Sequence, residues 1–571
     1  MKTLALAAAL AIVPGVVSAG TLVAGAVRDG DGYAVAGAQL AVTAADGRVT
    51  ARGTTAADGT FAIDSAGVPA ALDVTCSFCV PQRVALTGDP AAVFVVRYAA
   101  LRDRLPSTDD IAALPYGRAA DAAALVPYTI VSPRGISDRG LGEGQGAALI
   151  DGISFYRPTD GINALYLVPL HSTASIGADS AGFAQVYGGY GAGGTFDVGT
   201  LGDVSAEGRS GGDGQSGVLR TSGANGAATL GESTAFTAVR RATARLFEPV
   251  GGGTLALTAT AAGTSAADEA GVALTYATGL SRVDLAGSLT GSTSRTAAAY
   301  GTVTSAADVR TDVHVRGRGP AAVEFGLRAQ QSSGADGPSA VAGTQSEAAL
   351  YADARSTGNG ATLLASVALQ RDVQSLGAPR TWASNAVLPA LSVEHPLGAG
   401  FSLRASTTAT LRENYLLQIA PAAVPAAAPF VHANLVDAAL SFSDGHRLRA
   451  DVVAYTQQSG DAGGRIAGFG LNAAWQITPQ LALRSWALAA FANADEDAPP
   501  AYPYAYPETA TTLRRQVAWL TYRHNVRVDL LTTGSGIDGS LGIPFGRTAT
   551  LLAGSYGAPY GRVVTLGVRF R

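Results

Sequence analysis

Apolar and polar residues alternate with a period of two over much of the second half of the chain. In residues 323–330 one face collects Val323, Phe325, Leu327 and Ala329, and the other collects Glu324, Gly326, Arg328 and Gln330. Segments 401–406, 481–484 and 526–530 repeat the pattern. Because successive side chains of a β-strand point to opposite faces, the pattern predicts strands with one apolar face and one polar face.

This alternation continues over residues 203–571, a stretch too long for one soluble β-sandwich, and arginine and glutamate recur on its polar face. Both features favour a transmembrane antiparallel β-barrel with lipid outside and water inside. Turn sequences recur about every 30–45 residues, which leaves room for two membrane strands and a loop. They lie at 251–253, 279–281, 317–319, 358–360, 396–400, 443–445 and 478–480.

The alternation also assigns a face to each side chain of these strands. We expect Phe325 to face lipid and Gly326 to face the interior. A charge costs about 2–4 kcal/mol on the lipid face near the bilayer midplane and little on the inner face. Arginine at position 325 is therefore expected to disturb the barrel much more than arginine at position 326, unless Gly326 packs directly against the plug.

The start of the chain indicates export. Residues 1–19 combine a positive start at Lys2, an apolar run and small residues at Val17-Ser18-Ala19, which is the layout of a secretory signal peptide. No later stretch is apolar for the roughly 18 residues that a membrane-spanning helix requires.

Charged residues are 15% and hydrophobic residues 47% of the chain, which excludes a mostly disordered protein. The net charge of −4, without a basic block, argues against a nucleic-acid partner.

Residues 20–100 predict a small β-domain. Short alternating runs are separated by Asp-Gly pairs at 46–47 and 58–59, which are strong hairpin signals. The order of these pieces resembles the carboxypeptidase-regulatory-like β-sandwich. Cys76 and Cys79 are the two cysteines of the chain, and in an exported protein we expect them to form a structural disulfide. Alkylation of the unreduced protein should then label neither cysteine, whereas labelling of both would indicate a redox or metal role.

Two blocks of residues 101–202 resemble the plug domain of TonB-dependent outer-membrane receptors. The first block contains Arg139-Gly140 and, after a short gap, Asp151-Gly152. The second ends the segment and contains Tyr187-Gly188 and Gly193-Gly194. They stand in the family's order and spacing, although a characteristic glutamate is missing near 173–178 and no TonB box is evident.

The resemblance implies a mainly β chain with an N-terminal β-sandwich, an α/β plug and a C-terminal transmembrane barrel of about 22 strands. It implies a location in the cell outer membrane and active uptake of a scarce, bulky nutrient such as a siderophore, a cobalamin or a glycan. A TonB-type periplasmic protein would couple this uptake to energy. We also expect Arg134 and Arg139 of the plug to pair with carboxylates of the barrel wall.

Two segments are candidates for ligand contact. Residues 494–507 carry Tyr502, Tyr504 and Tyr506 between prolines, and residues 419–432 end with Phe430 and His432. Prolines stiffen such loops, and aromatic rings offer flat amphipathic faces. An aromatic girdle or a plain solvent loop is the alternative for each.

The sequence offers no catalytic site, no metal site and no cofactor site. Its six histidines are scattered, and none forms a metal-binding pair on a helix. We therefore do not expect an enzyme. Two alternatives to the transporter stay open, namely an uncoupled structural or adhesive outer-membrane barrel and a secreted carbohydrate-binding β-protein.

Overall fold

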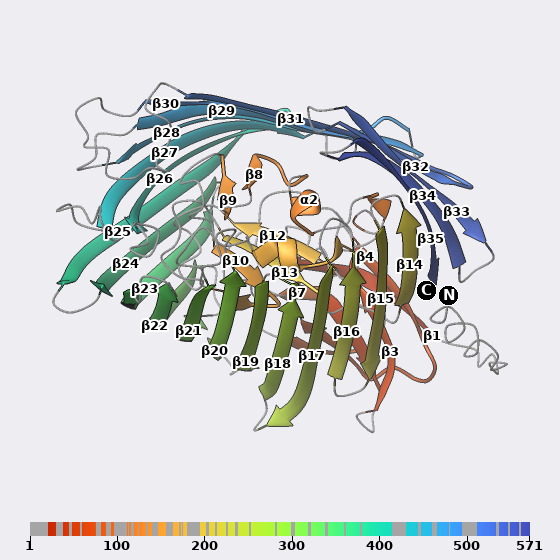
Figure 1. Cartoon of the computed structure of the whole chain (residues 1–571), viewed down its shortest axis with the longest axis horizontal. Helices are drawn as coiled ribbons and strands as arrows, with labels where there is room; N and C mark the ends of the chain where they lie inside the picture. The colour runs from red at the N-terminus through yellow and green to blue at the C-terminus, as the bar shows by residue number, and fades with distance from the viewer. Residues whose placement is uncertain are drawn as a thin grey trace.

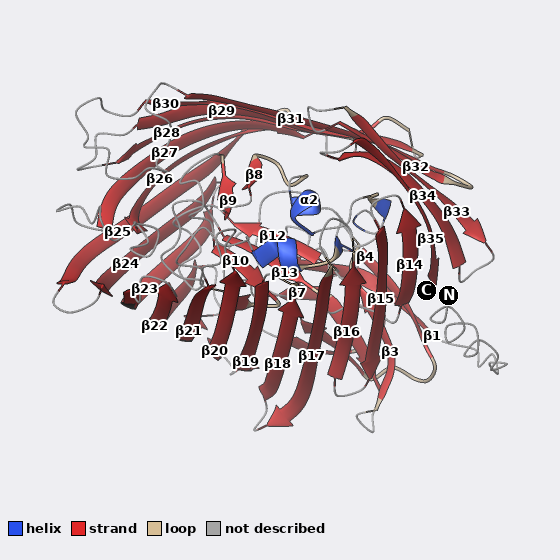
Figure 2. Ribbon diagram, viewed as in Figure 1, coloured by secondary structure: helices blue, strands red, loops and turns tan. Residues whose placement is uncertain are grey.

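A computed structural model of the chain shows an almost entirely β architecture (Figures 1 and 2). It describes residues 21–570 except 30–37, 45–47, 57–59, 76–81, 87–92, 96–110, 112, 116–118, 124, 133–134, 140–146, 156–163, 171–172, 174, 180–194, 201–204, 212–213, 224–225, 235–237, 251–252, 266, 280–282, 298–302, 318–320, 337–340, 359–360, 377–379, 414–429, 444–446, 460–464, 479, 494–510, 533–535, 546–548 and 559–560. The proposed signal peptide, both cysteines and the three tyrosines of segment 494–507 lie outside this description.

The first seven strands form the predicted N-terminal β-sandwich. One sheet has the order β4-β1-β7 and the other the order β3-β2-β5-β6. The two sheets enclose a common apolar core that includes Val27, Leu40 and Leu72. The strands are β1 (Thr21–Asp29), β2 (Gln39–Thr43), β3 (Val49–Thr54), β4 (Thr60–Ser65), β5 (Ala71–Thr75), β6 (Gln82–Ala85) and β7 (Val93–Val95).

The plug elements lie inside the ring of barrel strands (Figure 1). They comprise a hairpin of β8 (Thr129–Ser132) and β9 (Gly135–Asp138), and a mixed sheet with the order β11-β10-β13-β12. The strands of this sheet are β10 (Ala147–Ile150), β11 (Ile153–Ser154), β12 (Ser175–Asp179) and β13 (Thr195–Gly199), and the helical pieces are α2 (Ala119–Ala123) and η1 (Ala164–Leu167).

Twenty-two strands close into one antiparallel barrel, because β14 pairs with both β15 and β35. The expected transmembrane-type barrel of about 22 strands is thus confirmed. The strands are β14 (Ser205–Gly211), β15 (Gly214–Gly223), β16 (Gly226–Ser233), β17 (Val239–Val250), β18 (Gly253–Gly263), β19 (Ala267–Gly279), β20 (Val283–Ala297), β21 (Val303–Gly317), β22 (Ala321–Asp336), β23 (Val341–Gly358), β24 (Ala361–Leu376), β25 (Arg380–Gly398), β26 (Phe401–Glu413), β27 (Phe430–Ser443), β28 (Leu448–Ser459), β29 (Arg465–Gln476), β30 (Leu481–Asn493), β31 (Thr511–Arg523), β32 (Arg527–Thr532), β33 (Ile537–Phe545), β34 (Ala549–Ala558) and β35 (Gly561–Phe570).

The two ends of the barrel differ in their connections. At the end where β14 begins and β35 ends, every connection has two to four residues, and all seven predicted turns lie there. At the opposite end, nine connections have two to five residues, while 414–429 and 494–510 are much longer. We call these the turn end and the loop end. Because such barrels have short periplasmic turns and longer extracellular loops, the loop end corresponds to the cell exterior.

The predicted faces of the strands are confirmed. Phe325 is 61% exposed on the outer surface of the barrel, whereas Arg328 is 0% exposed on the inner side. Apolar side chains outside and polar ones inside are the arrangement of a membrane-spanning barrel. Among the described helices, none has the length and apolar character needed to cross a membrane.

Gly326 faces the interior as predicted, but a close contact there bears on the expected tolerance of arginine. A side chain at this position would overlap the ring of Tyr351, which lies across Gly326 from the adjacent strand β23. Inward orientation alone therefore does not make position 326 tolerant of arginine, because the interior at this point is already filled by a neighbouring wall residue.

Candidate functional site at the contact of plug and barrel

Arg139 fastens the plug to the barrel wall through a buried ion pair. Its Nη1 lies 2.9 Å from Oδ2 of Asp437 on β27, and the two side chains are 4% and 5% exposed. Nη2 of Arg404 lies 3.7 Å from the other carboxylate oxygen. A guanidinium can satisfy a buried carboxylate by directed hydrogen bonds. The expected pairing of Arg139 with a wall carboxylate is thus confirmed, whereas Arg134 lies outside the described residues.

The backbone holds Arg139 in a defined place. Arg139 follows β9 with a positive φ of 58°, and its N–H donates to the carbonyl of Tyr128 over 2.8 Å. Tyr455 of β28 donates its hydroxyl to the carbonyl of Arg139 over 2.5 Å. The Arg139 guanidinium also lies 5.9 Å from the centre of the Tyr455 ring. The wall therefore binds both the side chain and the backbone of this residue.

Tyr128 makes the second contact of the same hairpin. Its hydroxyl donates to Asp451 of β28 over 2.6 Å, and its ring meets Trp486 of β30 edge-to-face at 6.3 Å. Gly470 of β29 leaves the space that the Tyr128 ring occupies, because a Cβ there would overlap the ring. A barrel glycine thus has a packing role that its place in a strand does not reveal.

The Asp151-Gly152 pair forms the turn between β10 and β11. Both residues have positive φ, 53° and 79°, a conformation that glycine adopts freely and aspartate tolerates. The Asp151 carboxylate accepts bonds of 2.7 Å each from the N–H and the hydroxyl of Thr200. The carbonyl of Thr200 in turn accepts from the Thr229 hydroxyl on β16 over 2.8 Å. The two plug blocks therefore meet at Asp151 and Thr200 and are fastened together to the wall.

Two further wall arginines reach plug backbone. Arg209 donates to the carbonyl of Leu114 over 2.6 Å and pairs with Glu207. Arg241 pairs with Glu269 at 2.6 Å and donates weakly to the carbonyl of Leu167. Apolar plug residues share one buried core with wall residues from strands β19, β27, β28, β30–β32, β34 and β35. The plug is therefore packed against the wall as well as hydrogen-bonded to it.

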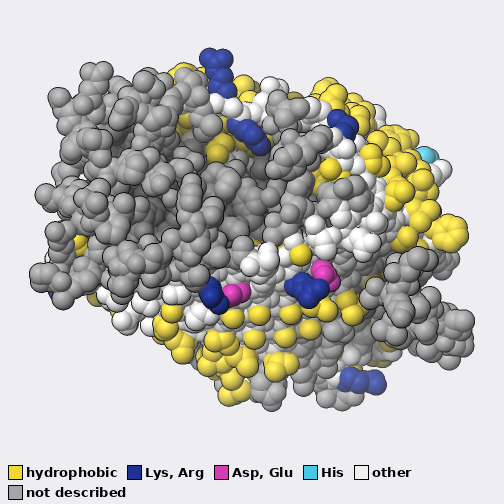
Figure 3. All heavy atoms as spheres, in the orientation of Figure 1, with side chains coloured by type: hydrophobic (Ala, Val, Ile, Leu, Met, Phe, Trp, Pro, Cys, Tyr) yellow, Lys and Arg dark blue, Asp and Glu magenta, His cyan; other side chains and the backbone are white. Residues whose placement is uncertain are grey.

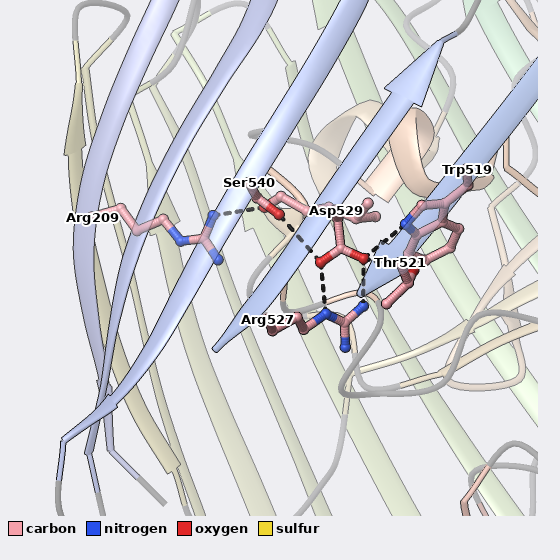
Figure 4. Close-up of polar contacts among 7 residues, drawn as sticks. Arg209, Trp519, Thr521, Arg527, Asp529 and Ser540 are labelled. Carbon is pink, nitrogen blue, oxygen red and sulfur yellow. Dashed lines mark hydrogen bonds and ion pairs between the residues drawn. The ribbon is translucent and has the colours of Figure 1, made fainter. Parts of the chain in front are cut away.

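Other charges of the inner wall neutralise one another. Asp529 of β32 is completely buried and accepts hydrogen bonds from Trp519, Thr521, Arg527 and Ser540, as Figure 4 shows. On the opposite strands, Arg328 and Glu347 form a fully buried pair at 2.6 Å. Within the described part of the chain, no three metal-ligating side chains come together.

The remaining sequence candidates are placed in part. Gly140, Tyr187, Gly188, Gly193, Gly194, Tyr502, Tyr504, Tyr506, Cys76 and Cys79 lie outside the described residues. Phe430 and His432 belong to strand β27 and not to a loop, which corrects the predicted extent of segment 419–432. His432 is exposed and alternates with the buried, inward-facing Ala433 and Leu435. It therefore faces away from the barrel interior.

Sequence reasoning missed the wall residues that receive the plug. Asp437 is 298 positions from Arg139, and Asp451 is 323 positions from Tyr128. Neither carboxylate stands in a motif. The sequence shows only that both residues occupy polar positions of alternating segments. Many other residues occupy such positions, so the pattern does not single these two out.

Comparison with known proteins agrees with this geometry. No family model matches the chain, and no curated protein sequence matches it. The FrpB iron transporter from Neisseria meningitidis (F3-3 variant) is 12% identical, with a TM-score of 0.67 over 83% of this chain and 99% of that one. The ferric yersiniabactin uptake receptor FyuA from Yersinia pestis is 11% identical, with a TM-score of 0.64 over 82% and 97%.

The alcaligin outer-membrane receptor FauA from Bordetella pertussis is also 11% identical, with a TM-score of 0.63 over 88% of this chain and 98% of that one. At such identities the likeness concerns the fold. The fold of the chain is that of the TonB-dependent outer-membrane receptors, as its plug motifs predict.

Proposed function

We propose that the chain is an outer-membrane receptor for energy-coupled uptake of a scarce, bulky nutrient, with a siderophore, a cobalamin or a glycan as the substrate class. One observation carries the proposal: a folded plug is fastened inside a closed barrel by the buried Arg139–Asp437 pair. A barrel filled in this way is no open pore, so passage of a ligand requires the plug contacts to rearrange. Such rearrangement is work that an external energy source can supply.

The similar structures support uptake as the task. They include an iron transporter, a ferric yersiniabactin uptake receptor and a copper transporter. A metal chelate is accordingly our first choice among the substrates.

The connections at the loop end suggest where this ligand makes contact. Nine connections there are too short to form a binding surface, so the chain available for ligand contact is concentrated in 414–429 and 494–510. The second segment carries three tyrosines and four prolines. We propose that these two segments supply the outer ligand contacts.

Growth tests the substrate class. Iron-starved cells with and without the gene would be supplied with ferric hydroxamate, catecholate or phenolate chelates, and other cells with cobalamin or a glycan. We expect one of these nutrients to support growth only with the gene. A variant in which 494–510 is replaced by a short Gly-Ser linker should lose this growth while its heat-modifiable migration on gels persists. The matched control replaces residues 460–464, a short connection at the same end of the barrel, with a Gly-Ser linker. This variant should leave growth unchanged.

A plugged barrel without energy coupling is the second candidate, and the missing TonB box favours it. Pull-down of the intact receptor with the periplasmic domain of TonB separates the two. Capture supports coupled uptake, and absence of capture supports the uncoupled barrel.

A further inference from the structure

The arginines that face outward from the described strands all lie in the loop-end half of the barrel. Six arginines project outward from the described strands, namely Arg240, Arg295, Arg371, Arg465, Arg514 and Arg562. Arg240, Arg465 and Arg562 are the first or second residues of strands that start at the loop end, and the others lie within six residues of that end. They come from strands all around the barrel, so they form a discontinuous belt, here called the arginine belt.

The belt lies directly beyond the apolar surface. On β35, Arg562 is followed on the outward face by Val564 and Leu566, which are 59% and 64% exposed. Figure 3 shows such hydrophobic side chains in broad patches over the barrel strands. A lipid-facing arginine is strongly unfavourable at the bilayer midplane but costs little at the interface, so these positions belong at the membrane boundary.

The depth of Arg371 agrees with this boundary. It stands ten residues beyond Ala361, the turn-end start of β24. A strand that rises about 3.3 Å per residue and tilts by about 40° climbs roughly 25 Å over this length, which is the height of the apolar band. Arg371 is therefore at the level of the lipid headgroups of the outer leaflet.

Among the described residues, no carboxylate stands directly opposite Arg371 or Arg514 on an adjacent strand. The residues opposite Arg371 on the adjacent strands are Ala348 and Asn385, and Arg514 stands opposite Ala489. By contrast, Arg240 pairs with Glu232 at 3.1 Å, and Arg295 stands opposite Asp268. Among the described residues of the belt, six arginines face these two carboxylates, so positive charge is in excess there.

We propose that the arginine belt binds the phosphate groups of lipids in the outer leaflet, with Arg371 and Arg514 as its strongest contacts. A guanidinium presents a planar set of donors that matches phosphate oxygens. Its charge also attracts an anionic lipid surface. This proposal requires that the barrel spans a membrane, but it does not depend on which nutrient is taken up. A negative result in the uptake assay would therefore not contradict it.

Native mass spectrometry and titration of the detergent-solubilised full chain test the proposal. The probes are bisphosphorylated lipid A and the same lipid without its phosphates. The variant Arg371→Gln/Arg514→Gln should bind the phosphorylated lipid about thirty-fold more weakly at low salt, since each arginine near an anionic surface contributes about a factor of five. The phosphate-free lipid should bind both proteins equally.

Arg447→Gln/Arg523→Gln is the matched control, because it removes two exposed arginines at the turn end. It should retain the affinity of the native chain for the phosphorylated lipid. Heat-modifiable migration shows that each variant is folded. Unchanged affinity in the Arg371→Gln/Arg514→Gln variant, or an equal loss in the control, would overturn the proposal.

Discussion

Removal of Arg139 should loosen the plug while leaving the barrel intact. In Arg139→Ala the carboxylate of Asp437 stays buried and loses the partner that lies 2.9 Å away. Breaking a buried ion pair from one side costs about 3–5 kcal/mol. We expect the lower end of this range because Arg404 stands 3.7 Å from the other oxygen of the same carboxylate. The equilibrium for opening of the β8–β9 hairpin should then rise about 100-fold, at 1.4 kcal/mol per factor of ten.

Hydrogen exchange of the backbone amides measures this change. Protection of β8 and β9 should fall about 100-fold in Arg139→Ala, while protection of the distant strands β21–β24 stays the same. Asp437→Leu combined with Arg139→Met removes both charges and should recover part of the protection. Arg240→Ala is the control, because its pair with Glu232 is exposed, and exposed pairs contribute about 0–1 kcal/mol. Native protection of the hairpin in Arg139→Ala would refute the role of the ion pair.

Three further substitutions probe other contacts. Phe325→Arg places a charge on the lipid face and should abolish heat-modifiable migration, whereas Thr293→Arg places it on an exposed residue near the loop end and should preserve migration. The opposite result would mean that the faces or the depths of these residues are misassigned. Gly470→Ala should displace the tyrosine ring packed on it and increase proteolysis of the plug, while Gly208→Ala, which meets no neighbour, should not. Asp151→Ala removes two hydrogen bonds at a positive-φ turn and should lower plug protection by about 1–3 kcal/mol, with partial rescue by asparagine; full protection in the alanine variant would contradict this role.

Much of the barrel could be predicted because its physics is local. A period of two assigns every side chain of a strand to a face, and short turns punctuate the strands. The outward Phe325 and the buried Arg328 follow from this rule alone. The turn at Asp151-Gly152 is local in the same sense, since its two positive φ angles suit these two residues.

For the contacts between plug and barrel, the sequence predicts the type of interaction but not the residues that form it. The charge of Arg139 inside a polar interior calls for a carboxylate, but nothing in the spacing selects Asp437 from the other acidic residues of the wall. Gly326 shows the same limit, because the ring that fills its space comes from a different strand. Pairings of this type depend on how the barrel closes and where the plug lies within it, and these are properties of the whole fold.

Uptake of radioactive iron tests the central claim most directly. Iron-starved cells would receive the chelate that supports growth, with the gene, without it, and with the gene plus an uncoupler of the inner membrane. Energy-coupled uptake through a plugged barrel predicts saturable accumulation that requires the gene and stops with the uncoupler. Accumulation that persists in the presence of the uncoupler, or that is equal without the gene, would contradict it.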